Sequence, residues 1–483
     1  MSISEESCDQ IASPSQRSLK VRERSFRVGR VTVYLRSRIW YLRYHERGKR
    51  FQVRAGTDRA QARKQASEVN IQIENGLTAS TSFQKVTVAD LREYWLEHHE
   101  SVLRSSLATI ARYRTASQHL IDFCLSQRAA PRYASNVEPA HVADFVRYLR
   151  RIKVAPNGHA NSEKRHLRDK GVHYILEVCR SLFNFAIKRR HLAPYSGNPF
   201  TALEVDRVPI EDAKPITLFT REQEESFLQA CDDWQRPMFL MLFLTGMRPG
   251  ELCHLLLPDD VDLTAGVVHI RNKPQLGWKV KTRSERDIPV HPQVVSELNA
   301  YLRGRTTGAV FRQRRCFKDY SPPLEGFDRQ ALEREAIRRI NDLKVMGTDE
   351  LTRAARSRVA RTIWRELAAV DEDEVRREFI KVCKKVPGLE NQTAPKTLRH
   401  GFATMLQDAN VDPLVRNLLM GHAPSTEGFC TNLVASLGMT AAYTHTRPST
   451  VRAQTLRAID LRWNLLYDDK SEGRNSIRPF INI

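Results

Sequence analysis

The N-terminal part of the chain alternates apolar or aromatic residues with arginines, which is the period-two pattern of β-strands. The alternation runs from about residue 28 to 57 and is interrupted by turn residues at 46–49, so it predicts a small basic antiparallel sheet. Asp58 is placed to cap a following helix, which Gly76 ends. Residues 1–26 lack any such periodicity and are expected to form a disordered tail.

Four basic side chains of this sheet are candidates for DNA contact. A two-stranded ribbon fits the major groove, and guanidinium groups pair with phosphates or base edges. A solvated sheet face explains the same charges equally well. The four candidates are Arg36, Arg38, Arg43 and Lys49.

Farther along, apolar residues recur at helical spacing, for example Leu91 with Trp95 and Leu120 with Phe123. They predict a block of four or five helices between about residues 86 and 190. A proline-containing connection follows, and it separates this block from everything after about residue 217. We take it as the main domain boundary.

The next region opens with a helix whose end is apolar on every side. Thr220 and Gln223 have the spacing of a capping box, and the run MFLMLFL at 238–244 is expected to be buried. The helix stops at Gly246, and Arg248 lies in the break that follows. Since Pro249 suits the first turn of a new helix, Arg248 is expected to be held between two packed helices, with Glu251 three residues later.

The pattern then changes to short strands, predicted at 267–270, 278–281 and 286–290, so that Lys281 ends a strand beside a tight turn. Residues 313–392 are charged and mostly helical in pattern. They contain no motif that indicates chemistry.

Two further helices present polar residues at their ends. One carries its apolar residues on a single face, while Arg399 falls in its first turn. Asp412 is placed to cap the next helix, and Gly421 stops that helix with His422 just outside.

The net charge of the chain indicates which class of molecule it binds. The 483 residues include 77 Lys and Arg against 56 Asp and Glu, a formal net charge of +21 that favours a polyanion, with nucleic acid first. A basic protein kept soluble by its charge is the alternative. The eight cysteines form no C-x-x-C pair, which argues against a disulfide framework or a zinc site. Without an apolar leader or a run long enough to cross a bilayer, the chain is expected to be soluble and intracellular.

Five residues beside breaks in secondary structure form a set suited to phosphoryl transfer. Two arginines can clamp one phosphate and stabilise its additional negative charge in a five-coordinate transition state. A tyrosine can attack phosphorus when a base or nearby cations stabilise its phenolate, and a lysine can protonate the leaving oxygen. Each residue alone is more often merely solvated, so the combination carries the prediction. The set is Arg248, Lys281, Arg399, His422 and Tyr443, the last within GMTAAYTHTRPS.

These motifs resemble those of the tyrosine recombinases, the phage-integrase family of site-specific DNA recombinases. The similarity covers about residues 217–466, and the helical block shows a weaker likeness to the family's core-binding domain. Five motifs in the family's order make the signal specific, whereas one alone would be weak. They are LTGMRPGEL, KTRSERDIPV, LRHGFAT, LLMGH and AAYTHT.

The resemblance implies a role for each matching residue. Arg248 and Arg399 match the arginines on the scissile phosphate, and Glu251 matches the acidic residue that supports the first. Tyr443 matches the nucleophile that forms a 3′-phosphotyrosyl bond, and His422 a residue that hydrogen-bonds the phosphate. Lys281 matches the lysine that protonates the 5′ hydroxyl, with Lys279 as the alternative if the hairpin register is shifted.

Two departures from the family pattern concern the proton acceptor and the nucleophile. Lys396 stands where the family usually has histidine, so it serves either as a base after losing its proton or only as a cation on the phosphate. Tyr443 follows His422 by 443 − 422 = 21 residues, a longer interval than is usual, which predicts a mobile nucleophile before DNA sites pair. Tyr467 is a rival nucleophile without the flanking motif.

The resemblance also implies the organisation of the chain and its partners. The expected fold is multidomain and mainly α, with an α-rich catalytic domain that contains a small antiparallel sheet. Neither metal nor ATP is required, because the phosphotyrosine conserves the bond energy. A homotetramer on double-stranded DNA is expected, with accessory DNA-bending proteins possible, no membrane, and a cytoplasmic, nucleoid-associated location. The expected domains are a tail (1–26), an arm-type DNA-binding sheet (27–78), a core-binding domain (84–192), a linker (193–216), a catalytic domain (217–466, with the insertion 313–392) and a C-terminal tail (467–483).

Within this assembly, the helix of about residues 449–466 is expected to pack against a neighbouring protomer through Val451, Leu456, Ile459 and Leu466. Two other functions are compatible with the motifs. A type IB topoisomerase shares the chemistry but relaxes DNA without exchanging partners. A catalytically silent DNA-binding protein would keep the fold alone.

Overall fold

The computed structural model describes residues 25–81, 83–126, 131–155, 161–192, 196–202, 208–211, 216–282, 284–318, 320–345, 352–422 and 446–467. The chain divides into two compact units, residues 1–214 and residues 215–483. The structure is mainly helical with small antiparallel sheets and an N-terminal four-stranded sheet, which confirms the predicted fold class at this level. Most of the predicted tail of residues 1–26, and nearly all of the tail from 467, lie outside the described residues.

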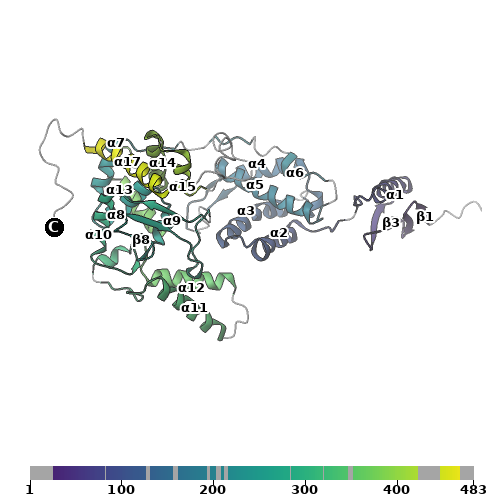
Figure 1. Cartoon of the computed structure of the whole chain (residues 1–483). Coiled ribbons are helices and arrows are strands. Elements are labelled where there is room, and N and C mark those ends of the chain that lie inside the picture. Colours follow the sequence, from purple (N-terminus) through teal and green to yellow (C-terminus); the bar gives the residue numbers. More distant parts are fainter. Residues whose placement is uncertain are drawn as a thin grey trace, which may run out of the picture. The chain divides into compact units, whose positions relative to one another are not determined.

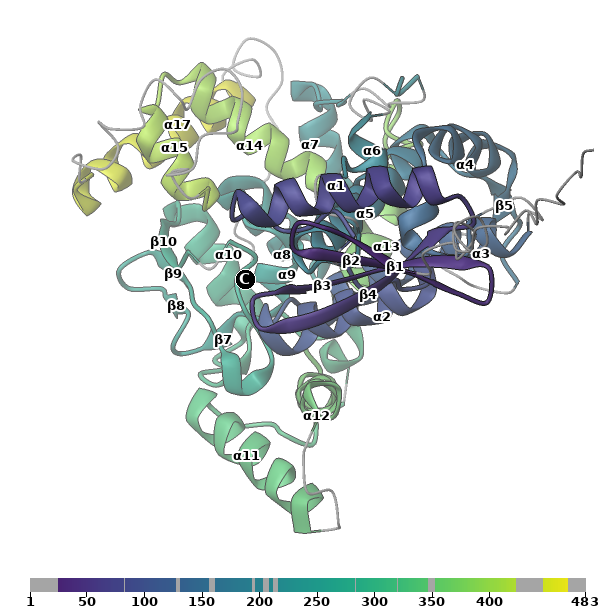
Figure 2. The ribbon, with the colours of Figure 1, turned by 90° about the vertical axis from the view of Figure 1, so that its right-hand side faces the viewer.

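The N-terminal sheet is an antiparallel meander in the order β1-β2-β3-β4. Its alternation places Val31, Val33 and Leu42 on a fully buried face, against which α1 packs with Ala62 and Ala66. Figure 2 shows α1 lying across this sheet. The elements are β1 (Ser25–Val28), β2 (Val31–Arg36), β3 (Ile39–Glu46), β4 (Lys49–Gly56) and α1 (Arg59–Glu74).

The helical block of the first unit has its own core, in which Phe145, Leu176 and Phe183 are fully buried. Helix α3 packs against α5, and α2 packs against both (Figure 1). The elements are α2 (Val88–Glu97), α3 (Leu107–Ser126), α4 (Pro139–Arg151), α5 (Asp169–Lys188) and α6 (Pro199–Ala202), with a short pair of strands, β5 (Lys153–Val154) and β6 (Arg165–His166).

The second unit is built around α8 (Gln235–Thr245), whose residues 238–244 are all buried, as the sequence predicts. It contacts α7 (Arg221–Ala230), α9 (Pro249–Cys253), α10 (Pro292–Leu302) and α14 (Lys396–Asp408). The predicted capping box of Thr220 and Gln223 opens α7. Helix α14 is followed by α15 (Pro413–Met420) and α17 (Pro448–Tyr467).

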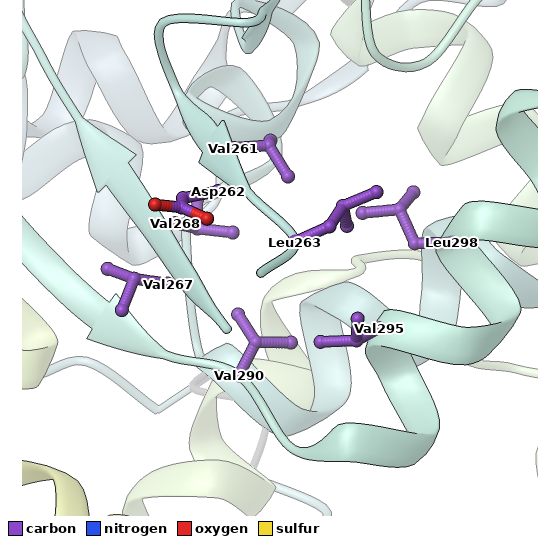
Figure 3. Close-up of a pocket in the computed structure, with 8 residues that line it drawn as sticks. All are labelled: Val261, Asp262, Leu263, Val267, Val268, Val290, Val295 and Leu298. Atoms are coloured by element: carbon purple, nitrogen blue, oxygen red, sulfur yellow. The ribbon is translucent and has the colours of Figure 1, made fainter. Parts of the chain in front are cut away.

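A three-stranded antiparallel sheet in the order β10-β9-β8 flanks this core. The strands are β8 (Val261–Asp262), β9 (Val267–Ile270) and β10 (Arg286–Pro289), and a separate pair is formed by β7 (Leu256–Leu257) and β11 (Gly308–Ala309). Figure 3 shows the space between the sheet and α10, which is lined almost wholly by aliphatic side chains. It lacks the converging polar groups of a ligand site and serves packing. Its lining residues are Val261, Asp262, Leu263, Val267, Val268, Val290, Val295 and Leu298.

The strand predicted at 278–281 is wrong. Residues Pro274–Leu276 form a 3₁₀ turn and Gly277 adopts a left-handed φ of 68°, which breaks the extended path. Trp278 stacks on His254 with ring centroids 3.8 Å apart, and the N–H of Val280 donates to a side-chain oxygen of Asn272 instead of a neighbouring strand. Lys281 therefore lies in a turn.

The C-terminal helix also differs from expectation. Within α17, Val451 and Ile459 are buried in the core of their own unit, where the helix contacts α14 and β10. The proposed contact of these two residues with a neighbouring protomer is wrong for this structure, because their apolar surface is already covered. Leu456 is half-buried, and the side chain of Leu466 lies outside the described residues.

Candidate active site

The break after α8 is shaped by Gly246, which has a φ of 60°. A Cβ atom at this position would lie 2.2 Å from Cδ1 of Phe402 in α14, closer than any side chain tolerates. Glycine therefore permits both the left-handed turn and the close approach of α14. Its carbonyl oxygen accepts a hydrogen bond from the Arg399 guanidinium, so the turn that precedes Arg248 also positions Arg399.

Arg248 is fixed by Glu251, one turn farther along α9. Its backbone N–H donates to Oε2 of Glu251 and its Nη1 to Oε1, both at 2.9 Å. The Glu251 side chain is 1% exposed, whereas 23% of the Arg248 side chain remains open. A buried carboxylate thus holds the guanidinium in place, while part of the Arg248 side chain remains exposed to solvent. A residue that clamps a phosphate needs both features.

A second arginine, Arg286 of β10, completes the carboxylate's hydrogen bonding. Its Nη1 and Nη2 donate to Oε1 and Oε2 of Glu251 at 3.1 and 2.7 Å, in a bidentate pair whose two side chains are each 1% exposed. Burial alone would raise the pKa of Glu251, but hydrogen bonds and charge from Arg286, with help from Arg248, hold it below its ordinary value. Glu251 is therefore ionised at neutral pH.

Arg286 was missed by our sequence analysis, although a signal was present. It stands two residues before Ile288 on the same strand, and therefore on the face that Ile288 buries. A buried arginine requires a carboxylate partner, which points back to Glu251. Its Nε also donates to the carbonyl of Leu419 at 2.8 Å, and a Cβ at Gly421 would lie 2.8 Å from its Nη1. Arg286 thus joins the sheet to the end of α15, directly before His422.

Arg399 and His422 meet at this junction. Arg399 is 6% exposed, and its Nη2 contacts the carbonyl of Met420 and Nε2 of His422, the latter at 3.5 Å. Burial and the nearby charge of Arg248 lower the pKa of Arg399 to about 10, so it stays protonated at neutral pH. Burial and the charges of Arg399, Arg248 and Arg286 lower the pKa of His422. The imidazole is therefore neutral in the absence of a bound anion.

The two candidate lysines lie on the exposed part of the 271–285 segment. Lys281 is close enough to Glu372 for its charge to lower the pKa of that carboxyl, which burial and the neighbouring Asp373 and Asp371 raise overall. A Cβ at Gly250 would lie 2.5 Å from the same carboxyl, which places Lys281 near the start of α9. Lys279 is exposed two residues earlier.

The remaining candidates are placed less completely. Lys396 is the first residue of α14, is exposed, and contributes to the lowered pKa of His400, after burial. Tyr443 lies outside the described residues. Tyr467 is the last residue of α17. The structure therefore brings together Arg248, Glu251, Arg399 and His422, and places Lys281 near α9.

On the N-terminal sheet, the face opposite α1 is basic and aromatic. Tyr34 and Tyr41 pair across β2 and β3 with ring centroids 5.7 Å apart, and the Arg43 guanidinium lies 5.9 Å from the Tyr34 centroid. Strand register places Arg36 on this face as well. Arg38 lies instead in the turn, with a φ of 65°, and Lys49 pairs with Glu46 at the hairpin end. The same register adds three arginines that our sequence analysis did not select: Arg27, Arg50 and Arg54.

Comparison with known proteins shows what the second unit is similar to. The Phage integrase family model matches residues 217–361, a range that includes Arg248, Glu251 and Lys281. Tyrosine recombinase XerA of Pyrococcus furiosus is 28% identical over 231 residues, 48% of this chain and 55% of that protein. Tyrosine recombinase XerD of Shewanella oneidensis is 22% identical over 343 residues, 70% of this chain and 85% of that protein. The match therefore spans only about half the length of the first of these relatives.

Solved structures resemble the chain more loosely. The Tn1549 transposon integrase in complex with circular intermediate DNA has a TM-score of 0.46 at 18% identity, covering 76% of this chain and 99% of that one. A lambda integrase dimer bound to a COC′ core site gives 0.44 at 16%, covering 92% and 97%. Residues 217–361 thus match the Phage integrase family, and the curated relatives named above are tyrosine recombinases, which confirms the resemblance that the ordered motifs predict.

Proposed function

We propose that this protein is a site-specific DNA recombinase that cuts and rejoins DNA through a 3′-phosphotyrosyl intermediate. The observation that supports this most strongly is the arrangement of Arg248, Arg399 and His422 around one junction. Glu251 and Arg286 lie beneath it as a buried ion pair. Among the described residues, Arg399 donates only to carbonyl oxygens and to His422, so no carboxylate is hydrogen-bonded to it, and Glu251 acts on it only through its charge. The site is thus organised to receive an anion.

The proposed reaction exchanges one phosphoester bond for another, so the number of such bonds does not change. Tyr443 loses its phenolic proton to water, its oxygen attacks the scissile phosphorus, a tyrosine–phosphorus bond forms, and the bond to the 5′ oxygen breaks. Lys281 gives its proton to that leaving oxygen, while Arg248 and Arg399 stabilise the charge on the non-bridging oxygens. His422 donates to the same phosphate, and the incoming negative charge favours its protonated form. A 5′ hydroxyl from another strand then reverses the step, so neither metal nor ATP enters the balance.

Lys396 has two proposed roles in this scheme. As a free amine it can accept the tyrosine proton; as an ammonium it can only attract the phosphate. Its exposed position at the start of α14 supports the second role, because an exposed lysine there is open to a bound phosphate.

The open face of the N-terminal sheet is proposed to bind duplex DNA. Arg36 and Arg43, which the sequence already suggested as DNA contacts, both lie on this face. The paired Tyr34 and Tyr41 add a flat aromatic surface beside them. Arg27, Arg50 and Arg54 extend the positive charge across the outer strands. We further propose that four protomers act on two sites in the cytoplasm, next to the nucleoid. None of the described helices is both long and apolar enough to cross a bilayer.

The function is tested by strand exchange. Wild-type protein is incubated with fragmented genomic DNA in EDTA, quenched with detergent, and the attached DNA is sequenced to reveal the target. Two duplexes that carry this target are then mixed. We expect exchanged products; supercoil relaxation without exchange would indicate a topoisomerase, and DNA binding without any covalent attachment would indicate a silent binder.

Lys281→Met is expected to slow strand cleavage about 10²–10⁴-fold, the usual contribution of a general acid. Cleavage is measured in single turnover on a nicked target duplex. Substrate with sulfur at the 5′ bridging position supplies a leaving thiol, which is far more acidic than an alcohol and therefore departs as the thiolate without protonation. This substrate is expected to restore the variant towards the wild-type rate.

Lys279→Met is the matched control, since it removes another exposed lysine from the same segment. Its rate should stay close to wild type. The opposite result would be a loss of cleavage in Lys279→Met that the sulfur substrate restores, together with a normal rate in Lys281→Met. The general acid would then be Lys279.

A further inference from the structure

The insertion that our sequence analysis left unexplained forms a helical hairpin of α11 (Arg329–Val345) and α12 (Arg353–Glu366), followed by α13 (Glu372–Cys383). The two helices pack together around Leu332, Ala336 and Ile363 (Figure 1, lower edge of the second unit). This small core is separate from the main core of the unit.

The hairpin is docked on the segment that leads to the candidate lysines. Trp364 donates from Nε1 to the carbonyl of Leu276 at 2.9 Å, and its ring meets His254 edge to face at 4.6 Å. Arg329 donates to the carbonyl of Asn272 at 3.1 Å. A Cβ at Gly277 would lie 2.7 Å from the Cβ of Ala360. The hairpin is thus attached to the 272–278 segment at several points, through both α11 and α12.

The exposed side of α12 carries a row of arginines. At about 100° per residue, Arg358, Arg361 and Arg365 fall within about 60° of one another around the helix. The buried residues Val359 and Ile363 face α11, and Ala360 and Trp364 face the 274–278 segment. All three arginines are exposed. They occupy the arc that neither neighbour covers, which we call the arginine face of α12.

The arginine face differs from the neighbouring helix in its charge balance. On α11, Arg338 pairs with Glu335 and Asp342, and Arg339 pairs with Glu335 and with Glu366 of α12. On the arginine face, the described residues supply no carboxylate partner; Arg361 contacts only the carbonyl of Ser357, at 3.4 Å. Like charges one turn apart disfavour a helix by a few tenths of a kcal/mol per pair. The row of charges is thus uncompensated within the described residues of this protein.

We propose that the arginine face of α12 binds the phosphate backbone of duplex DNA, next to the DNA that the catalytic site holds. The inference rests on the proposed function, because that function brings duplex DNA to this unit. Three guanidinium groups about one helical turn apart suit successive phosphates, and each can bind two oxygens. The hairpin then adds sequence-independent affinity and ties the lysine segment to bound DNA.

The test uses the full chain with Arg358→Gln, Arg361→Gln and Arg365→Gln combined. Binding to a fluorescein-labelled random-sequence duplex is measured over a series of KCl concentrations. Loss of three phosphate contacts should reduce the steepness of log K against log salt by about 0.9 × 3, or roughly 2.7. A second variant with lysine at the three positions keeps the charge and should retain most of the slope. Thermal melts verify that both variants are folded.

The matched control removes the same charge from α11 through Arg334→Gln, Arg338→Gln and Lys344→Gln, and its slope should change by less than one. Equal losses in the two Gln triples would show an effect of net charge alone and overturn the proposal. An unchanged slope in the α12 triple would also overturn it and point to a partner of another class. Covalent attachment by wild type is scored in parallel. Absence of covalent attachment would refute the proposed function. The salt dependence of binding tests the arginine face independently of that result.

Discussion

Tyr443→Phe is expected to abolish covalent attachment to DNA while leaving DNA binding within a factor of about two. The replacement removes only the phenolic oxygen, which the proposed reaction joins to phosphorus, so no covalent intermediate can form. The arginines that hold the phosphate are unchanged, and their ground-state contacts persist. Attachment is measured on denaturing gels with labelled target duplex, and binding on native gels with the same DNA.

Tyr467→Phe is the matched control, because it removes the same atom from a tyrosine that lies at the end of α17. It should attach to DNA as wild type does. Attachment by Tyr443→Phe, together with its loss in Tyr467→Phe, would transfer the nucleophile to the helix end and contradict the assignment from the AAYTHT motif.

Glu251→Ala is expected to destabilise the second unit by about 3–5 kcal/mol, the usual cost of leaving one member of a buried ion pair unpartnered. The Arg286 side chain is 1% exposed and would lose both hydrogen bonds to the carboxylate. Arg248 would lose its support at the same time. Urea denaturation gives the stability, and strand cleavage below the transition should fall by at least about tenfold as the clamp loses its geometry.

Two comparisons isolate the buried charge. Asp342→Ala breaks a surface pair with Arg338, whose side chain is 61% exposed, and should cost at most about 1 kcal/mol. Combining Glu251→Gln with Arg286→Met removes both charges and should recover much of the lost stability without restoring cleavage. A Glu251→Ala protein as stable as the Asp342→Ala protein would show that the pair does not organise this site.

Much of the candidate site could be predicted because local rules place its residues. Gly246, Pro249 and Gly421 fix helix ends through backbone geometry that is readable from short motifs. Arg248, Arg399 and His422 then follow, since each lies within three residues of such an end or in a first turn. Burial of residues 238–244 follows from a helix that is apolar all round.

Other features depended on contacts that a sequence does not show. The strand predicted at 278–281 failed because Trp278 stacks on His254, whose partner Trp364 comes from the insertion. Arg286 was overlooked because its partners, Glu251 and the carbonyl of Leu419, are 35 and 133 residues away in sequence. The apolar positions of α17 were assigned to a neighbouring protomer, but periodicity alone cannot distinguish a contact within the chain from one between chains.

The central claim is that Tyr443 becomes joined to DNA through phosphorus. The measurement that tests it most directly is mass spectrometry of the covalent complex, after digestion of the DNA with nuclease and of the protein with protease. We expect a nucleotide adduct on the peptide that contains Tyr443, formed in EDTA and absent from Tyr443→Phe. An adduct on any other residue, or persistent attachment in that variant, would contradict it.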